Sequence, residues 1–130
     1  MSKISLDKNA IEQMNPLVLA FIGDAVETLH VRTRLALTDT SKSHALHLKT
    51  SQEVNARAQS DSAAKVLPYL TEEEQAVYRR ARNSKSHHHA KNYSVVDYRR
   101  ASGLEAVLGY LYLAGEEERL EEIFEIMERI

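Results

Sequence analysis

Two features of the sequence most constrain what this chain can fold into. Residues that form turns are scarce, and apolar residues recur at helical spacing. The sequence of 130 residues holds only four glycines and two prolines. It also has few runs of β-branched residues, which would favour strands. A chain of this length is expected to form one domain around one core. The pattern therefore predicts a single all-α domain over residues 1–130.

Local signals place the ends of several helices. Asn15 can cap a helix that has Pro16 in its first turn. Thr71 and Glu74 form a capping box, in which each side chain bonds the backbone amide of the other residue. The predicted helices span residues 16–37, 45–58, 62–70, 71–83, 95–113 and 117–130, with polar connectors at 38–43 and 84–92.

Apolar residues recur at helical spacing in the first and last of these segments. They are Leu17, Phe21, Leu29 and Leu35 in the first, and Leu120, Ile123, Phe124 and Met127 in the last.

Two carboxylates stand alone inside apolar helices. Asp24 is the only charged residue of segment 16–26, and Glu105 is the only one of segment 101–115. A buried lone carboxylate costs several kcal/mol unless a partner compensates it. If the two helices pack together, the acids could converge and share a proton or hold a divalent cation. Oxygen ligands without histidine or cysteine suit Mg²⁺ or Mn²⁺. The alternative is that each acid meets a core arginine or backbone amides.

Glycines near the two acids favour convergence. Gly23 precedes Asp24, and Gly103 and Gly109 flank Glu105. A glycine inside a helix costs roughly 1 kcal/mol relative to alanine. Close approach of another helix or of a ligand would explain that cost.

The overall composition excludes several classes of protein. There is no cysteine, so the chain has neither disulfides nor a thiolate zinc site. No apolar run reaches the roughly 18 residues of a membrane span, and the N-terminus is unlike a signal peptide. We therefore expect a cytoplasmic protein that does not enter a membrane.

The net charge of −2 conceals an uneven distribution. Residues 79–100 carry seven arginines and lysines against Asp97 alone, whereas residues 116–130 carry seven glutamates and two arginines. The basic segment could be a solvated helix end that complements the helix dipole. Alternatively, it could contact the phosphates of a nucleic acid without reading sequence. The three histidines His87–His89 are poorly placed for a shared metal ion, because consecutive side chains seldom converge.

Four segments, in order, resemble the ribonuclease III family. FIGDAV (residues 21–26) resembles its signature, and LHLKTSQEVNARAQ (46–59) resembles the short helix that follows. ARNSKS (81–86) and YRRASGLEAVLGYLYL (98–113) look more specifically like the Mini-III ribonucleases, which lack the double-stranded-RNA-binding domain. The resemblance covers residues 14–127. It implies an all-helical endonuclease domain that acts as a symmetric homodimer with the signature helix near its interface.

The resemblance also implies the chemistry. Family members hydrolyse double-stranded RNA with Mg²⁺ and leave 5′-phosphate and 3′-hydroxyl ends. The Mini-III enzymes trim precursor large-subunit (23S) ribosomal RNA, and a ribosomal protein is a candidate partner. Asp24 matches the signature aspartate and Glu105 the final glutamate, so both are expected to be catalytic metal ligands. Mn²⁺ is the alternative ion.

The sequence departs from ribonuclease III at three acidic positions. Ala20 and Leu17 stand where acids lie four and seven residues before the signature aspartate, and Ser102 replaces an aspartate. Mini-III sequences share these departures. Fewer ligands should mean weaker metal binding in the absence of RNA.

The expected RNA contacts follow from the same resemblance and from charge. Without an added binding domain, the chain must hold an A-form duplex through its own phosphate contacts. The candidate contacts are Arg82, Asn83, Lys85, Lys91, His47 and Lys49. Two alternatives stay open: an inert ribonuclease III-like module that binds RNA or ribosomes, and a helical scaffold unrelated to RNA. The number of metal ions, the cleavage position and the role of the acidic C-terminal segment stay open as well.

Overall fold

The computed structural model describes residues 3–84 and 94–129, and every described element is a helix. The elements are α1 (Lys8–Glu12), α2 (Pro16–Thr38), α3 (Ser43–Glu53), α4 (Ala56–Val66), the 3₁₀ turn η1 (Leu67–Tyr69), α5 (Glu72–Arg82), α6 (Val95–Leu113) and α7 (Glu117–Met127). The predicted all-α class is therefore confirmed for the described part of the chain.

The predicted capping signals define the helix ends. The Asn15 side chain accepts a hydrogen bond from the Leu17 amide at 2.8 Å, with Pro16 at the first position of α2. Thr71 and Glu74 form both bonds of the capping box at the start of α5. Helix α6 ends before Gly115, whose φ of 73° is a conformation that favours glycine.

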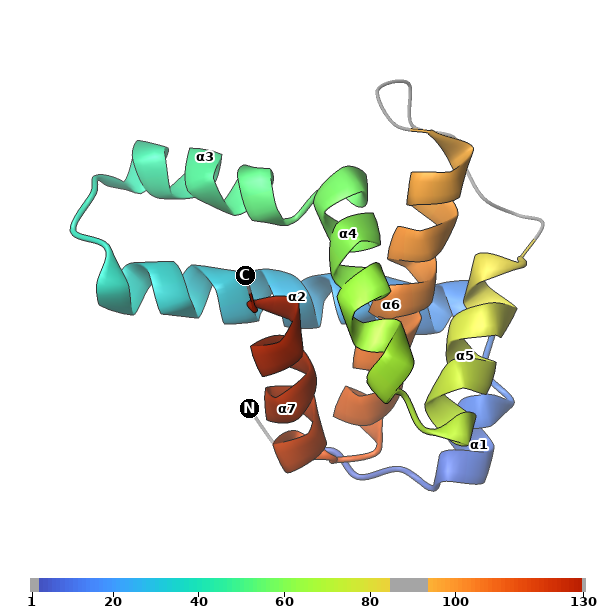
Figure 1. The fold of residues 1–130 in the computed structure, drawn as a ribbon. Coiled ribbons are helices and arrows are strands. Elements are labelled where there is room, and N and C mark those ends of the chain that lie inside the picture. Colours follow the sequence, from blue (N-terminus) through green and yellow to red (C-terminus); the bar gives the residue numbers. More distant parts are fainter. Residues whose placement is uncertain (1–2, 85–93, 130) are drawn as a thin grey trace.

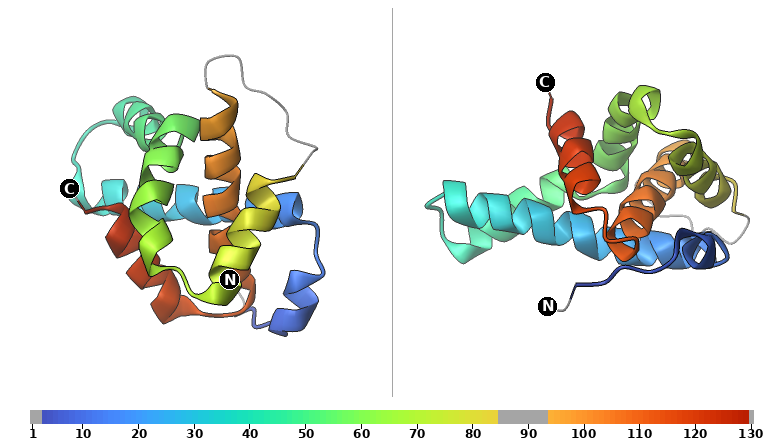
Figure 2. Two further views of the ribbon diagram at one scale, coloured as in Figure 1. Left: turned by 45° about the vertical axis from the view of Figure 1, so that its right-hand side comes forward. Right: turned by 90° about the horizontal axis from the view of Figure 1, so that it is seen from below.

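Helix α6 lies at the centre of the fold. Helices α2, α4 and α5 all pack extensively against it, and most of its residues are buried. In Figure 1, α2 crosses behind α4 and α6, and α7 stands beside the middle of α2. The C-terminal half of α2 and α3 form an antiparallel arm that extends away from this body, as the right view in Figure 2 also shows. Figure 1 thus places the two apolar segments, in α2 and α6, across one another.

Two glycines allow the backbones of α2 and α6 to touch. A Cβ atom on Gly23 would lie 1.6 Å from the carbonyl oxygen of Glu105, and one on Gly109 would lie 2.1 Å from that of Leu19. Both separations are far below van der Waals contact, so only glycine fits at either position. The close approach expected from the glycines is confirmed.

Some of the sequence predictions are wrong in detail. The helix predicted for residues 45–58 ends at Glu53, because the Asn55 side chain accepts from the Ala58 amide and caps a new helix there. The helix predicted to begin at residue 62 therefore begins at Ala56, and the short α1 was not anticipated. The last helix ends at Met127, and most of the predicted connector 84–92 lies outside the described residues.

The apolar residues of α2 differ in burial. Leu35 is buried, as are four of four predicted residues on the inner face of α7. Phe21 and Leu29, in contrast, are largely exposed. Their helical spacing therefore marks a second apolar face rather than the core. None of the described helices is both long and apolar enough to cross a membrane.

We expect Gly109→Ala to destabilise the fold severely. The new methyl group would overlap the Leu19 carbonyl, which belongs to a helix backbone and cannot move away alone. We expect a loss of at least about 3 kcal/mol in urea unfolding, at the upper end for overpacked cores. Gly103→Ala is the matched control on the same helix. The atoms nearest to its methyl group would belong to the side-chain ring of Tyr78 rather than to a helix backbone, so the loss should be smaller, and the opposite order would contradict this account.

Candidate active site

The two acids singled out in the sequence meet where α2 crosses α6. Gly23 rests on the backbone of Glu105, so Asp24, the next residue, lies beside the Glu105 side chain. The two carboxyl groups lie close enough for Asp24 to raise the pKa of Glu105. Glu105 is half-buried, whereas Asp24 is exposed, which corrects the expectation that both acids are buried. One acid of the pair therefore faces solvent.

A third acid, Glu27, belongs to the same cluster and was missed in the sequence. It is only 2% exposed and follows Asp24 by almost one turn of α2. Its Oε1 accepts a hydrogen bond of 2.7 Å from Nε2 of Gln59, a buried residue of α4. The spacing of three residues after Asp24 was the signal available, because residues three and four apart share a helix face.

The environment raises the pKa of two of these acids. Burial raises the pKa of Glu105 to about 9, and the charge of Asp24, its hydrogen bond and the charge of Glu27 add to this. Burial also raises the pKa of Glu27 to about 7, helped by the charges of Asp24 and Glu53 and opposed by the Gln59 hydrogen bond. A core arginine beside Glu105 would lower its pKa instead. The alternative of a compensating arginine is therefore wrong for Glu105.

The donors of this cluster fit a hard divalent cation. The carboxyl groups of Asp24 and Glu105 offer oxygen atoms only, and their mutual repulsion is the kind that a cation relieves. Within residues 3–84 and 94–129, no three side chains of histidine, cysteine, aspartate or glutamate are grouped closely enough to hold a metal. Two carboxylates suit Mg²⁺, which keeps several waters and takes further ligands from phosphates.

The side chains at the three positions where ribonuclease III has further acids pack inside this fold. Ala20 is buried in the core and Leu17 is half-buried. Ser102 is buried, and its hydroxyl donates to the Tyr98 carbonyl at 3.1 Å, one turn earlier in α6. Apolar or locally bonded side chains thus occupy these three positions.

The predicted RNA-contacting residues lie in separate places. Arg82 and Asn83 end α5, where Arg82 Nε donates to Asn83 Oδ1 at 3.1 Å and the guanidinium lies 5.8 Å from the centre of the Tyr78 ring. Lys85, Lys91 and the histidines 87–89 lie outside the described residues.

The other two predicted contacts lie on α3. His47 is exposed there, and it lines a small pocket against α2. Lys49 is already paired with Asp39, and its Nζ also lies 3.1 Å from the Ser41 hydroxyl. Lys49 would therefore have to leave Asp39, or share its charge, to bind a phosphate.

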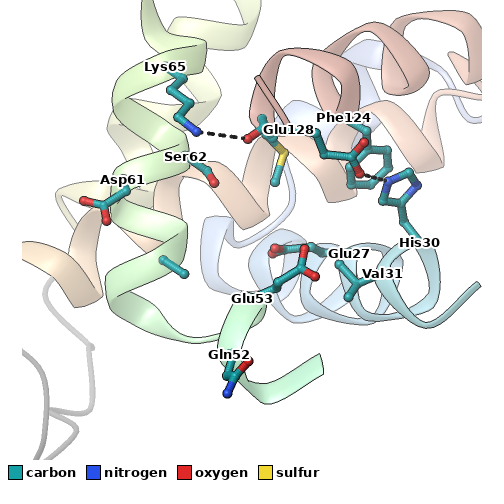
Figure 3. Close-up of a pocket in the computed structure, with 12 residues that line it drawn as sticks. Glu27, His30, Val31, Gln52, Glu53, Asp61, Ser62, Lys65, Phe124 and Glu128 are labelled. Atoms are coloured by element: carbon teal, nitrogen blue, oxygen red, sulfur yellow. Dashed lines mark hydrogen bonds and ion pairs between the residues drawn. The ribbon is translucent and has the colours of Figure 1, made fainter. Parts of the chain in front are cut away.

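A pocket of about 260 Å³ adjoins the acidic cluster on the side of α7. Figure 3 shows Glu27 pointing from α2 toward α4, with Glu53 beside it. His30 closes one edge, stacked on the Phe124 ring at 3.8 Å and within 2.6 Å of Glu128 Oε1. These contacts tie the acidic C-terminal helix to α2, so His30 has a structural role here.

One face of α2 carries an exposed apolar row, which consists of Val18, Phe21, Ala25 and Leu29. Phe21 is 75% exposed. Beyond Leu29 the row continues into an apolar groove of about 460 Å³ between α2 and α7, to which Val26 and Tyr112 also contribute. An apolar surface of this kind usually marks a contact with another molecule.

Comparison with known proteins places this arrangement among nucleases. The family model of the Ribonuclease III domain matches residues 17–116. The Mini-ribonuclease 3 of Clostridium tetani is 50% identical over 92% of this chain and 80% of its own length. The Mini-ribonuclease 3 of Thermoanaerobacter is 46% identical over 93% of this chain and 85% of its own length. A crystal structure of a Fusobacterium nucleatum protein has a TM-score of 0.81 and 33% identity, and the match covers 89% of this chain and 93% of that one.

The raised pKa of Glu105 predicts how the stability of the metal-free protein depends on pH. The folded protein keeps a proton on Glu105 up to a pKa of about 9, whereas the unfolded chain loses it near the ordinary value of 4.5. The folded state therefore loses stability as the pH rises from about 4.5 toward 9. In EDTA at pH 8, we expect Glu105→Gln to raise Tm by roughly 5 °C, equivalent to about 1 kcal/mol.

The matched control for this experiment is Glu125→Gln, an exposed glutamate on α7. It makes the same change of charge outside the cluster and should leave Tm unchanged. The difference between the two variants should vanish at pH 4. A Glu105→Gln variant no more stable than the control at pH 8 would refute the raised pKa.

Proposed function

The chain belongs to the ribonuclease III family and is an endoribonuclease, and we propose that it cleaves double-stranded RNA with Mg²⁺ at Asp24 and Glu105. The observation that carries the proposal is the meeting of these two carboxyl groups where α2 crosses α6. Hydrolysis would leave 5′-phosphate and 3′-hydroxyl ends. The substrate would be precursor 23S ribosomal RNA, as the resemblance to Mini-III ribonucleases implies.

Asp24 and Glu105 would hold the Mg²⁺ ion, or Mn²⁺ in its place. When bound, the ion would activate a water molecule and stabilise the charge that develops on the phosphate. The exposed Asp24 lies on the side from which a phosphodiester would approach, and the more buried Glu105 backs it from α6. The protein contributes a fixed separation of the two carboxyl groups, set by the glycine contact between the helices.

The basic residues would hold the duplex by its phosphates. Arg82 and Asn83 at the end of α5, together with Lys85 and Lys91, are the first candidates, and His47 and Lys49 on α3 are the second. Such contacts depend on charge and helix shape rather than on sequence. Selection of one ribosomal site would then depend on the fold of the RNA or on a partner such as a ribosomal protein.

A second copy of this chain would cover the apolar row of α2. The row lies on the helix that carries Asp24, and the family resemblance implies a homodimer with this helix near the interface. Phe21 of one protomer, which is largely exposed, would be buried there. The dimer would bring two active sites to one duplex, and each would cut one strand.

We expect Asp24→Asn to abolish cleavage while the fold and the assembly remain. The change removes the negative charge from the exposed acid and so removes one of two metal ligands. The measurement is the cleavage of an end-labelled RNA duplex, and of precursor 23S ribosomal RNA, with Mg²⁺ and with EDTA. Asp61→Asn, on the exposed surface of α4, is the matched control and should cleave normally.

Each outcome of that assay decides between the open alternatives. Cleavage that requires both Mg²⁺ and Asp24 would support the proposal. Normal turnover by Asp24→Asn would refute the assignment of the site. Tight RNA binding by the unaltered protein, without cleavage of either substrate, would favour the inert binding module instead.

We expect Phe21→Asp to yield a monomer and to lower cleavage of the duplex at least about tenfold. A charge at the centre of the apolar row would have to be buried without a partner in the dimer. Sedimentation or light scattering would report the mass of the particle. Leu37→Asp is the control, because Leu37 is also exposed on α2 but lies off the row. Equal masses for the two variants would refute this interface.

A further inference from the structure

Gln59 is a buried amide that joins two acids of the cluster. It lies on α4, is 5% exposed, and donates from Nε2 to Glu27 Oε1 at 2.7 Å. The Glu105 carboxyl group of α6 also lies close enough to this side chain for Gln59 to lower the pKa of Glu105. The nitrogen of a glutamine amide carries two hydrogens, so one amide can serve two carboxyl groups. Gln59 thereby connects α2, α4 and α6 at the site.

The carboxyl group of Glu27 lowers the stability of the fold in this position. It is almost fully buried, and the groups that act on its carboxyl are Gln59, Asp24 and Glu53, none of which is a cation. An apolar side chain at position 27 would avoid this cost. The carboxyl group does, however, supply the acceptor that fixes the Gln59 amide. Its contribution is therefore to the orientation of Gln59 rather than to the stability of the core.

Glu105 needs such support because its nearest charged neighbours repel it. Both Asp24 and Glu27 are acids, and each acts against the charged form of Glu105. Among the largest influences on the pKa of Glu105, the interaction with Gln59 is the one that favours the charged form. Carboxylates that bind metals are commonly held by hydrogen bonds from surrounding groups, and loss of such a bond weakens metal binding.

We propose that Gln59 is a positioning residue of the nuclease, which is anchored on Glu27 and holds the Glu105 carboxylate beside Asp24. This inference rests on the proposed function, since it assigns Gln59 and Glu27 to the same site. Glu27 is then an anchor and not a third metal ligand.

The first test replaces Gln59 with leucine, which keeps the approximate size and removes the amide. Val66→Ala is the matched control on the same helix, because Val66 is fully buried in the core and its truncation lowers stability without touching the acids. Both variants are assayed at a temperature where circular dichroism finds them folded. Two experiments are performed: kcat and KM are measured on an RNA duplex, and the Kd of Mn²⁺ for the RNA-free protein is measured by electron paramagnetic resonance.

We expect Gln59→Leu to lower kcat by about tenfold or more and to weaken Mn²⁺ binding by a similar factor, as is typical when such a supporting bond is lost. KM for RNA should change little. Val66→Ala should change neither kcat nor the Mn²⁺ affinity beyond twofold. The proposal is overturned if Gln59→Leu matches Val66→Ala in both kcat and Mn²⁺ affinity, because Gln59 would then serve the core alone.

The second test distinguishes an anchor from a ligand at position 27. Glu27→Leu removes the acceptor and should reproduce the losses of Gln59→Leu. Glu27→Gln restores a carbonyl acceptor for the Gln59 amide and should recover most of those losses. If Glu27→Gln were as inactive as Asp24→Asn, the charge of Glu27 would be required directly, and the positioning role would be refuted.

The two readouts keep this inference separate from the proposed function. A protein that fails to cleave any RNA would refute the proposed activity. Its Mn²⁺ affinity would still show whether Gln59 orders the two acids. Conversely, normal cleavage with unaltered Mn²⁺ affinity in Gln59→Leu would refute the inference and leave the nuclease assignment intact.

Discussion

The backbone contact between α2 and α6 is the constraint on which the rest of the structure depends. A Cβ atom at Gly23 or at Gly109 would overlap a carbonyl oxygen of the facing helix, so the two helices meet without side chains between them. Helices α4 and α5 pack along α6 and so supply the side chains around the crossing of α2 and α6. The distance between the Asp24 and Glu105 side chains follows from this one contact. Gly23 touches the backbone of Glu105, and Asp24 is the residue after Gly23.

The same contact brings together acidic side chains that the surrounding fold does little to neutralise. Burial, together with the charges of the neighbouring acids in the cluster of Asp24, Glu27 and Glu105, raises the pKa of Glu27 to about 7 and that of Glu105 to about 9. Glu74, another acid of the described chain, has a basic partner. Glu74 is also buried, but Arg119 holds it through two hydrogen bonds of 2.8 and 3.0 Å and lowers its pKa. The two buried glutamates of the described residues thus differ, because Glu74 is paired with an arginine, whereas Glu27 lies beside other acids at the site where a cation is expected.

The sequence was sufficient for the features that depend on local chemistry. The cap at Asn15, the capping box at Thr71 and the lone acids Asp24 and Glu105 can each be recognised within a few neighbouring residues. Gln59 and the exposure of Phe21 could not be predicted in this way. A buried glutamine acquires its role from an acid 32 residues earlier in the chain, and an exposed apolar row has the same helical spacing as a buried one. Only the packing of α2 and α4 on α6 distinguishes these cases.

The adjacency of Gly23 and Asp24 has a consequence for how such a domain can change through evolution. Glycine is required at position 23 by the helix contact alone, whereas aspartate at position 24 faces outward and the packing makes no demand on it. A descendant released from selection for cleavage would therefore be free to lose the aspartate but not the glycine. Gly23 would then be retained because the fold requires it, whereas Asp24 would be retained only as long as cleavage is selected.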